Sequence, residues 1–386
     1  MTITAVPSEM TVAASRGQAA VRNGGLDALR AALTLLVVLH HTAITYGGAG
    51  GWFYRELPMS DALSSQLLTM FCAINQSYFM GLFFLIAGYF TPAAVERHGV
   101  AAFVRERLTR LGVPFLVFGL LIGPATVALV QAVTRNRDFG EALLQRWRIG
   151  AFEPGPPWFC EALLIFAAAY LAVRFVFGRP GRFAFPSNRM LLFAAIVTGA
   201  VAFLLRLQWP VGVNVLALQL GFFASYIVLF AAGCLGAEAR WIERAPAAQV
   251  KLWRRVAWVT LPVLPLAMLT IPHIPALQGK PEGGWTVSAA LYAFWEPFVA
   301  WGIILALLSL FQRRFETLTP LWTNLARRAY LIFIIHPPVV VGIALAWRQV
   351  VLPPLLKFAV TGAAACVACY FLAGALLRVP VVRRVV

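Results

Sequence analysis

Long apolar stretches constrain the fold of this chain more than any other feature. Hydrophobic residues make up 61% of the sequence and charged residues 12%, whereas a soluble domain carries about 25% charged residues. About ten stretches approach the roughly 20 residues that a helix needs to cross a bilayer, so the sequence predicts an all-α polytopic membrane helical bundle. The expected spans lie near residues 27–47, 68–90, 112–133, 158–178, 189–207, 217–238, 255–272, 286–311, 329–348 and 358–378.

The placement of basic residues predicts the orientation of this bundle. Roughly two thirds of the 32 Lys and Arg residues fall in the two tails and in alternate loops between the expected spans. Because such residues favour the cytoplasmic side, both termini are expected in the cytoplasm. The net charge of +17 is spread between apolar runs, which argues against a nucleic-acid partner. The exception is the expected outside loop 134–157, whose four arginines could hold an anionic group.

Two further expectations concern domains and cofactors. Residues 1–23 are small, polar and unpatterned, so we expect a disordered N-terminal tail ahead of one transmembrane domain over 24–380. The five cysteines form no disulfide framework, and the sequence has no metal-ligand cluster, phosphate-binding loop or nucleophile elbow. We therefore expect no metal and no tightly bound cofactor.

Arg30 and His41 are polar residues in the first expected span. Eleven residues of helix make three turns plus about 20°, so both side chains face the same way, about 16 Å apart. A span with such a face directs it toward the protein interior rather than lipid. His41 is therefore a candidate general base or proton relay, or a histidine that is simply hydrogen-bonded within the bundle. His40 points about 100° away and is expected to be structural.

Glu296 and His336 also lie at membrane depth. A buried carboxylate must be paired or neutral, so Glu296 either partners the histidine, binds substrate or joins helices through an ion pair. His336 precedes Pro337 and Pro338, whose kink frees backbone carbonyls. It either satisfies one of these carbonyls or faces substrate, and the sequence leaves both open.

Arg107 and Arg110 open the third expected span from the cytoplasmic side. They lie one helical turn apart, and two guanidinium groups suit a phosphate group, although ordinary positive-inside anchors would look the same. Trp158 and Glu161 open the fourth span from the opposite side. There Glu161 could meet an acceptor or pair with an arginine of the preceding loop.

Several stretches together resemble the acyltransferase 3 family of integral membrane acyltransferases. They appear in family order over roughly residues 25–380, which is nearly the whole membrane part. One departure is Ala87 before Gly88, where the family often has serine. The stretches are 25–30 followed by ten residues and His41, 82–88, 103–114 with Arg107 and Arg110, Trp158-Phe159, and 330–337.

The resemblance implies transfer of an acyl group, commonly acetyl and sometimes succinyl, from cytoplasmic acyl-CoA as co-substrate. The acceptor would be a carbohydrate or lipid-linked hydroxyl at the envelope, in a bacterial inner membrane. His41 would be the catalytic residue, as base or transient acyl carrier, and Arg30 would orient it or hold donor phosphate. Arg107 and Arg110 would bind the phosphates of CoA.

Glu296 is expected among the catalytic residues, and Trp158, Glu161 and His336 are expected to contact substrate, with membrane lipid around the bundle. The main alternative is a secondary transporter, which would also have about ten spans with intramembrane His and Glu. Against it, no two halves carry matching Gly/Pro-interrupted spans, and the arginine pair suits a large phosphorylated donor better. A family member that only binds lipid or sugar is a third possibility, which the retained Arg30 and His41 disfavour.

Overall fold

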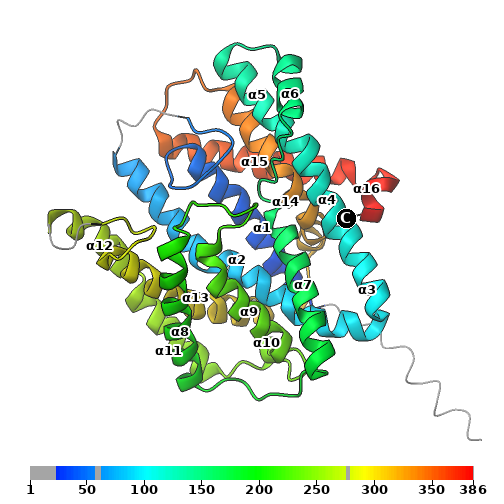
Figure 1. The fold of residues 1–386 in the computed structure, drawn as a ribbon, viewed down its shortest axis with the longest axis vertical. Helices are drawn as coiled ribbons and strands as arrows, with labels where there is room; N and C mark the ends of the chain where they lie inside the picture. The colour runs from blue at the N-terminus through cyan, green and yellow to red at the C-terminus, as the bar shows by residue number, and fades with distance from the viewer. Residues whose placement is uncertain (1–22, 57–61, 275–278, 386) are drawn as a thin grey trace, which may run out of the picture.

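A computed structural model describes residues 23–56, 62–274 and 279–385, and its regular elements in these ranges are helices (Figure 1). The expected disordered tail lies outside them except for Asn23, whose side chain accepts a hydrogen bond from the Leu26 N–H and caps the first helix. The elements are α1 (Gly24–Thr45), α2 (Ala62–His98), α3 (Val100–Arg107), η2 (Leu108–Gly112), α4 (Val113–Val117), η3 (Phe118–Ile122), α5 (Gly123–Arg135), α6 (Phe139–Arg148), α7 (Trp158–Phe177), α8 (Asn188–Gln208), η4 (Leu220–Phe222), α9 (Phe223–Gly236), α10 (Trp241–Arg244), α11 (Ala247–Thr260), α12 (Val263–Thr270), η5 (Ile271–His273), α13 (Val287–Arg314), α14 (Pro320–Ala346), α15 (Pro354–Leu376) and α16 (Pro380–Val385).

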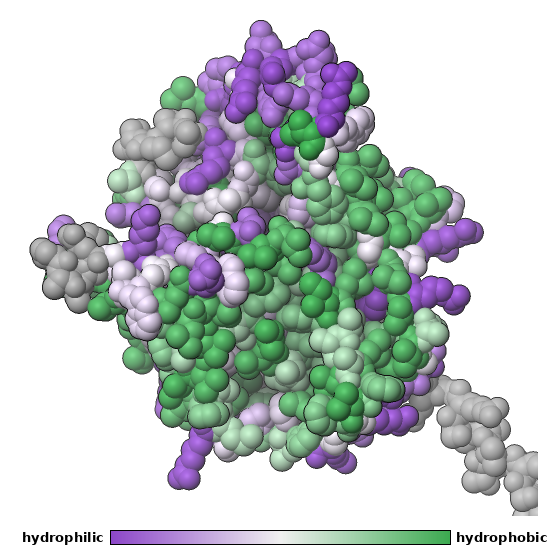
Figure 2. Space-filling view, viewed as in Figure 1, coloured by the Kyte–Doolittle hydropathy of each residue, from purple (hydrophilic) through white to green (hydrophobic). Residues whose placement is uncertain are grey.

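The predicted membrane bundle is confirmed. Within the described ranges, 9 helical stretches are long and apolar enough to cross a membrane, and the apolar helix Leu220–Gly236 is shorter. These correspond to the ten predicted stretches, so the chain is an integral multi-pass membrane protein. Figure 2 shows apolar side chains over the broad middle of one face, with hydrophilic ones gathered above them over the α5–α6 hairpin.

Two of the spans are not regular α-helices. The span Val100–Arg135 passes through two π-helical segments, η2 and η3, and such segments often accompany functional sites. The span Ala247–Thr270 is interrupted between α11 and α12, where Pro262 has no N–H to continue the helical hydrogen bonds. Arg107 ends α3 and Arg110 lies in η2, so the arginine pair spans the change from α-helix to π-helix.

Small residues allow α2 to cross the middle of the bundle against α9. A Cβ atom on Gly88 would lie 2.2 Å from the carbonyl oxygen of Phe230, and one on Gly233 would lie 2.2 Å from that of Leu85. Only glycine permits so close an approach of two helix backbones. The crossing packs Phe84 of α2 against Tyr226 of α9, with ring centroids 4.8 Å apart, in the largest core cluster.

Segments that were predicted on the same side of the membrane meet one another. Asn23 donates to Glu243 at 3.1 Å and accepts from Gln312 at 3.0 Å, which joins the start of α1 to α10 and the end of α13. At the other end of the bundle the N–H of Val211 donates to the carbonyl oxygen of Glu282 at 2.8 Å. These contacts agree with the charge count, which assigned successive loops to alternate sides of the membrane. The cytoplasmic position of the termini stays a prediction.

Candidate active site

A cavity of about 920 Å³ lies at the end of the bundle where α1 finishes. His40 and His41 of α1 form one part of its wall, and α2 contributes Cys72 and Gln76. Aromatic side chains from α7, α9 and α13 form another part, α5, η4 and α12 add apolar side chains, and connecting segments complete the wall. The lining residues of these segments lie within 49–53, 153–156, 211–219 and 281–282.

His41 is hydrogen-bonded to His336 of α14, which is fully buried. Nδ1 of His41 lies 2.9 Å from Nε2 of His336, and Nδ1 of His336 lies 2.7 Å from the carbonyl oxygen of Phe333. A carbonyl oxygen only accepts, so Nδ1 of His336 carries a proton, and in a neutral ring its Nε2 accepts from the Nδ1–H of His41. Nε2 of His41 is then unprotonated in the cavity wall, the form that a general base needs.

Pro337 explains why the Phe333 carbonyl is available to His336. In an uninterrupted α-helix this carbonyl would accept from the N–H of the residue four positions later, which here is Pro337. Proline has no N–H, so the carbonyl is freed and the His336 ring satisfies it. Of the two alternatives left open for His336, the structure shows the bond to a freed carbonyl, and the other ring nitrogen reaches His41.

Trp52 covers the histidine pair from the loop after α1. Its ring stacks on His41 with centroids 4.1 Å apart and planes 11° apart, and it lies 6.0 Å from the His336 ring. His41 and His336 are themselves stacked at 5.0 Å. The three nearly parallel rings limit rotation of the His41 side chain.

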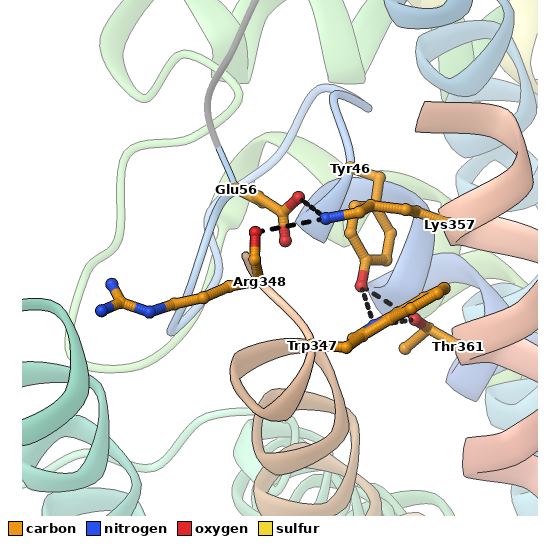
Figure 3. A network of polar contacts seen from close by, with 6 residues as sticks. All are labelled: Tyr46, Glu56, Trp347, Arg348, Lys357 and Thr361. Atoms are coloured by element: carbon orange, nitrogen blue, oxygen red, sulfur yellow. Dashed lines mark hydrogen bonds and ion pairs between the residues drawn. The ribbon is translucent and has the colours of Figure 1, made fainter. Parts of the chain in front are cut away.

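The loop that carries Trp52 is fixed to α15 by a buried ion pair (Figure 3). Lys357 is 3% exposed, and its ammonium donates to the Glu56 carboxylate and, at 3.5 Å, to the carbonyl oxygen of Arg348. The N–H of Glu56 donates to the carbonyl oxygen of Thr45 at 2.8 Å, so the segment 46–56 returns to the end of α1. We call the contact between Lys357 and Glu56 the latch.

A second set of contacts holds the start of the same loop. The hydroxyls of Tyr46 and Thr361 are 2.8 Å apart, and the indole N–H of Trp347 lies 3.2 Å from the first and 3.1 Å from the second (Figure 3). Burial raises the pKa of the Tyr46 hydroxyl to about 12, so it stays protonated. Both ends of the loop 46–56 are therefore anchored to α15, and its start is also bonded to Trp347, which follows α14.

Arg107 and Arg110 are placed differently from each other. The Nε atom of Arg107 is buried without a hydrogen-bond partner among the described residues, and its guanidinium lies 5.0 Å from the Phe103 ring. Arg110 is half exposed and lies 3.5 Å from Glu106, while its carbonyl oxygen accepts from the hydroxyl of Tyr330. Tyr330 stands six residues before His336 on α14, about 9 Å along the axis. The arginine segment thus reaches the same helix as the histidine pair.

Gln76, Tyr226 and Trp158 form a polar and aromatic part of the cavity wall. The amide of Gln76 donates to the Tyr226 hydroxyl at 2.8 Å. The rings of Trp158 and Tyr226 are stacked at 5.9 Å. Trp158 therefore lines the cavity, and its contact with substrate stays a prediction, whereas Gln76 and Tyr226 were not singled out from the sequence. Their only sequence signal was a polar residue in an apolar span, which occurs elsewhere in the chain too.

The structure joins Glu296 to Arg206 rather than to His41. The guanidinium of Arg206 is fully buried, donates to the Glu296 carboxylate, and donates to the carbonyl oxygen of Gly221 at 3.0 Å. The central guanidinium carbon of Arg206 lies 4.8 Å from the centroid of the Tyr292 ring, and Tyr292 lines the cavity. Of the alternatives left open for Glu296, the structure shows the ion pair between helices. Arg206 lies near the end of the expected span 189–207, and α8 continues to Gln208.

Arg30 and Glu161 lie away from the histidine pair. Arg30 is paired with Asp27 at 3.7 Å with 45% of its side chain exposed, near the start of α1 and about 16 Å along the axis from His41. Glu161 follows Trp158 by one turn of α7, and its Oε2 atom is buried without a partner among the described residues. One of the four arginines in the segment 134–157, Arg146, pairs with Glu153 rather than with Glu161.

Comparison with known proteins adds a family to this geometry. A family described as an acyltransferase domain matches residues 23–374. The chain is also similar to glucans biosynthesis protein C of Escherichia coli K12, from strains that include DH10B and BW2952, with 32% identity over 91 residues. That alignment covers 24% of this chain and 22% of the relative. No solved structure matches the chain.

Proposed function

The chain belongs to the acyltransferase 3 family, and on this premise we propose that it moves an acetyl or succinyl group from cytoplasmic acyl-CoA to a hydroxyl of an envelope carbohydrate. The membrane would be a bacterial inner membrane. The observation that carries the proposal is the hydrogen-bond chain from Phe333 through His336 to His41, which leaves one nitrogen of His41 unprotonated at the cavity. The name of the relative, glucans biosynthesis protein C, motivates the carbohydrate acceptor.

In the proposed reaction His41 acts as general base and then as general acid. Its Nε2 removes the proton of the acceptor hydroxyl as the oxygen attacks the thioester carbonyl carbon. The C–S bond of the resulting tetrahedral intermediate breaks, and His41 returns the proton to the departing thiolate. The products are an ester and CoA. A positioned base of this kind contributes about 10²- to 10⁴-fold in rate.

His336 and Trp52 act as positioning residues in this scheme. His336 accepts from the Nδ1–H of His41, which fixes the tautomer and directs Nε2 into the cavity. When His41 becomes an imidazolium during the reaction, both of its nitrogens carry protons and the bond to His336 is retained. The stacked ring of Trp52 keeps water from one face of the imidazole.

The donor end of the site is proposed at Arg107 and Arg110. The unpartnered Nε of Arg107 supports this role, because a buried guanidinium N–H without an acceptor is stabilised by a phosphate oxygen. The contact of Tyr330 with the Arg110 backbone connects this end to the helix that carries His336. CoA phosphates would bind there while the acyl thioester reaches the histidines.

The acceptor is proposed to bind against Gln76, Tyr226 and Trp158. Ligand sites combine aromatic walls with a few polar groups that fix orientation, and these three side chains supply both within one cavity. A sugar offers apolar ring faces and several hydroxyls, which match that combination. Glu296 is proposed to stabilise this wall indirectly, because it pairs with Arg206, whose guanidinium contacts the Tyr292 ring.

Mass spectrometry of envelope glycans and lipids tests this function in cells. We expect deletion of the gene to remove an acyl ester mass, and the wild-type gene to restore it. A His41→Ala gene should fail to restore it, whereas His98→Ala, which alters an exposed histidine at the end of α2, should succeed. Unchanged acyl esters together with altered uptake of a solute would replace this function with transport.

A further inference from the structure

The chain has a second histidine at the cavity, and we propose that His40 is a catalytic residue that donates a hydrogen bond to the carbonyl oxygen of the acyl group. This rests on the proposed acyl transfer and names the group that stabilises its oxyanion. Acyl transfer develops negative charge on the carbonyl oxygen, and a fixed donor at that oxygen is worth several kcal/mol in other acyl-transfer enzymes, on the order of 10²- to 10³-fold in kcat.

His40 is held rigidly beside His41. It is 6% exposed, its ring lies 4.9 Å from the Phe79 ring, and it meets the His41 ring edge-to-face at 5.5 Å. Its carbonyl oxygen is 3.9 Å from the thiol sulfur of Cys72, which also lines the cavity. The two ring contacts limit rotation of the His40 side chain relative to the base.

The surroundings of the two His40 ring nitrogens differ. Nδ1 is buried and has no hydrogen-bond partner among the described residues. Nε2 is not buried in this way, and His40 lines the cavity. A buried N–H without an acceptor is rarer and more costly than an acceptor that lacks a donor. In the neutral ring the proton therefore sits on Nε2, and His40 presents an N–H to the cavity.

His40 and His41 thus present opposite groups to the same space. Nε2 of His41 is an acceptor because His336 holds its proton on Nδ1, and Nε2 of His40 is a donor because its Nδ1 is enclosed. An acceptor hydroxyl bound at His41 can therefore attack a thioester whose carbonyl oxygen is bound at His40. Consecutive histidines on one helix place the base and the oxyanion donor together.

The other basic side chain of α1 does not fit this role. Arg30 is paired with Asp27 and stands about 16 Å along the helix from His41. Gln76, which could also donate, already gives a hydrogen bond to Tyr226 in the wall proposed for the acceptor. The indole N–H of Trp52, which stacks on His41, is itself a buried atom, so His40 is the donor beside the base whose second ring nitrogen is not enclosed.

In the balanced step, the acceptor oxygen forms its bond to the thioester carbon while its proton passes to Nε2 of His41. The electron pair of the C=O bond moves onto oxygen, where the N–H of His40 stabilises it. When that pair returns, the C–S bond breaks and the thiolate takes the proton from His41. His40 keeps its own proton throughout.

Steady-state kinetics with purified protein in proteoliposomes, acetyl-CoA and a glucan acceptor test the role of His40. We expect His40→Leu to lower kcat on the order of 10²-fold with little change in either KM. His40→Gln should recover most of the loss, because its amide offers an N–H at a similar distance from the backbone. His98→Gln is the matched control and should behave as wild type.

The outcomes separate this inference from the proposed function. Wild-type protein that transfers no acyl group would remove the proposed function itself. A working wild type with full kcat in His40→Leu would overturn the role of His40. So would a change confined to KM, or equal losses in His40→Leu and His40→Gln when both variants have the thermal midpoint of wild type.

Discussion

Pro337 is the residue that sets the protonation of the proposed catalytic pair. Its missing N–H frees the Phe333 carbonyl, that carbonyl holds the proton of His336 on Nδ1, and Nε2 of His336 then orients His41. The sequence of His336, Pro337 and Pro338 already offered a histidine bonded to a freed carbonyl as one of two alternatives. It could not show that the second nitrogen would meet His41, because that contact joins residues 295 positions apart.

We expect Pro337→Ala to lower kcat by about 10-fold, because a new N–H at position 337 would compete with His336 for the Phe333 carbonyl and loosen the tautomer of His41. The matched control is Pro338→Ala, whose new N–H would point to the carbonyl of Ile334 and leave the histidine pair untouched. Measuring kcat and KM of both variants checks this. Equal kcat values for the two variants would contradict the role of Pro337.

Other residues show the limit of prediction at this scale. His41, His336 and Trp158 could be singled out because each is a polar or amphipathic side chain at a defined place in an apolar span. Arg206 and Lys357 were not singled out from the sequence, yet both are buried and paired with carboxylates. Their partners, Glu296 and Glu56, lie 90 and 301 positions away. Charge counting treats each residue alone and cannot detect such pairs.

At the scale of elements, the loop 46–56 connects the catalytic helix to the far end of the chain. The latch between Glu56 and Lys357 and the contacts of Tyr46 with Trp347 and Thr361 fix this loop to α14 and α15. Because the loop carries Trp52, α15 influences how His41 is covered even though it supplies no residue to the cavity wall described here.

We expect Lys357→Met to lower the thermal midpoint, because the Glu56 carboxylate is left buried without its cation, a change that costs about 3–5 kcal/mol in buried pairs. Lys357→Met combined with Glu56→Gln should regain most of that stability, since no unpaired charge remains. Both variants should keep a reduced kcat, because neither holds Trp52 over His41. Wild-type kcat in the double variant would show that the latch has no part in positioning.

Helix irregularities also could not be predicted from the sequence pattern. The apolar stretch near 112–133 was correctly predicted as a span, but the two π-helical segments within it leave no mark in hydropathy. The two guanidinium groups differ in burial, and a joint role in phosphate binding stays a prediction. Arg107 turns toward the protein and Arg110 remains half exposed.

At the scale of the whole molecule, apolar length and charge alternation sufficed to predict the bundle. Each predicted span has a corresponding helix, and loops predicted on one side lie together. The cavity could not be predicted, because it forms where one end of α1 meets α2, α9 and segments from four separate regions of the chain. The proposed donor and acceptor ends approach the histidines from different parts of that bundle.

The central claim is that His41 carries the proton transfer during acyl transfer, and labelled transfer in proteoliposomes tests it most directly. Purified wild type, His41→Ala and the control His98→Ala are supplied with radiolabelled acetyl-CoA and a glucan acceptor. The account predicts labelled ester with wild type and His98→Ala, and a rate lower by about 10²- to 10⁴-fold with His41→Ala at equal protein and equal thermal midpoint. Labelled ester formed at the wild-type rate by His41→Ala would contradict it.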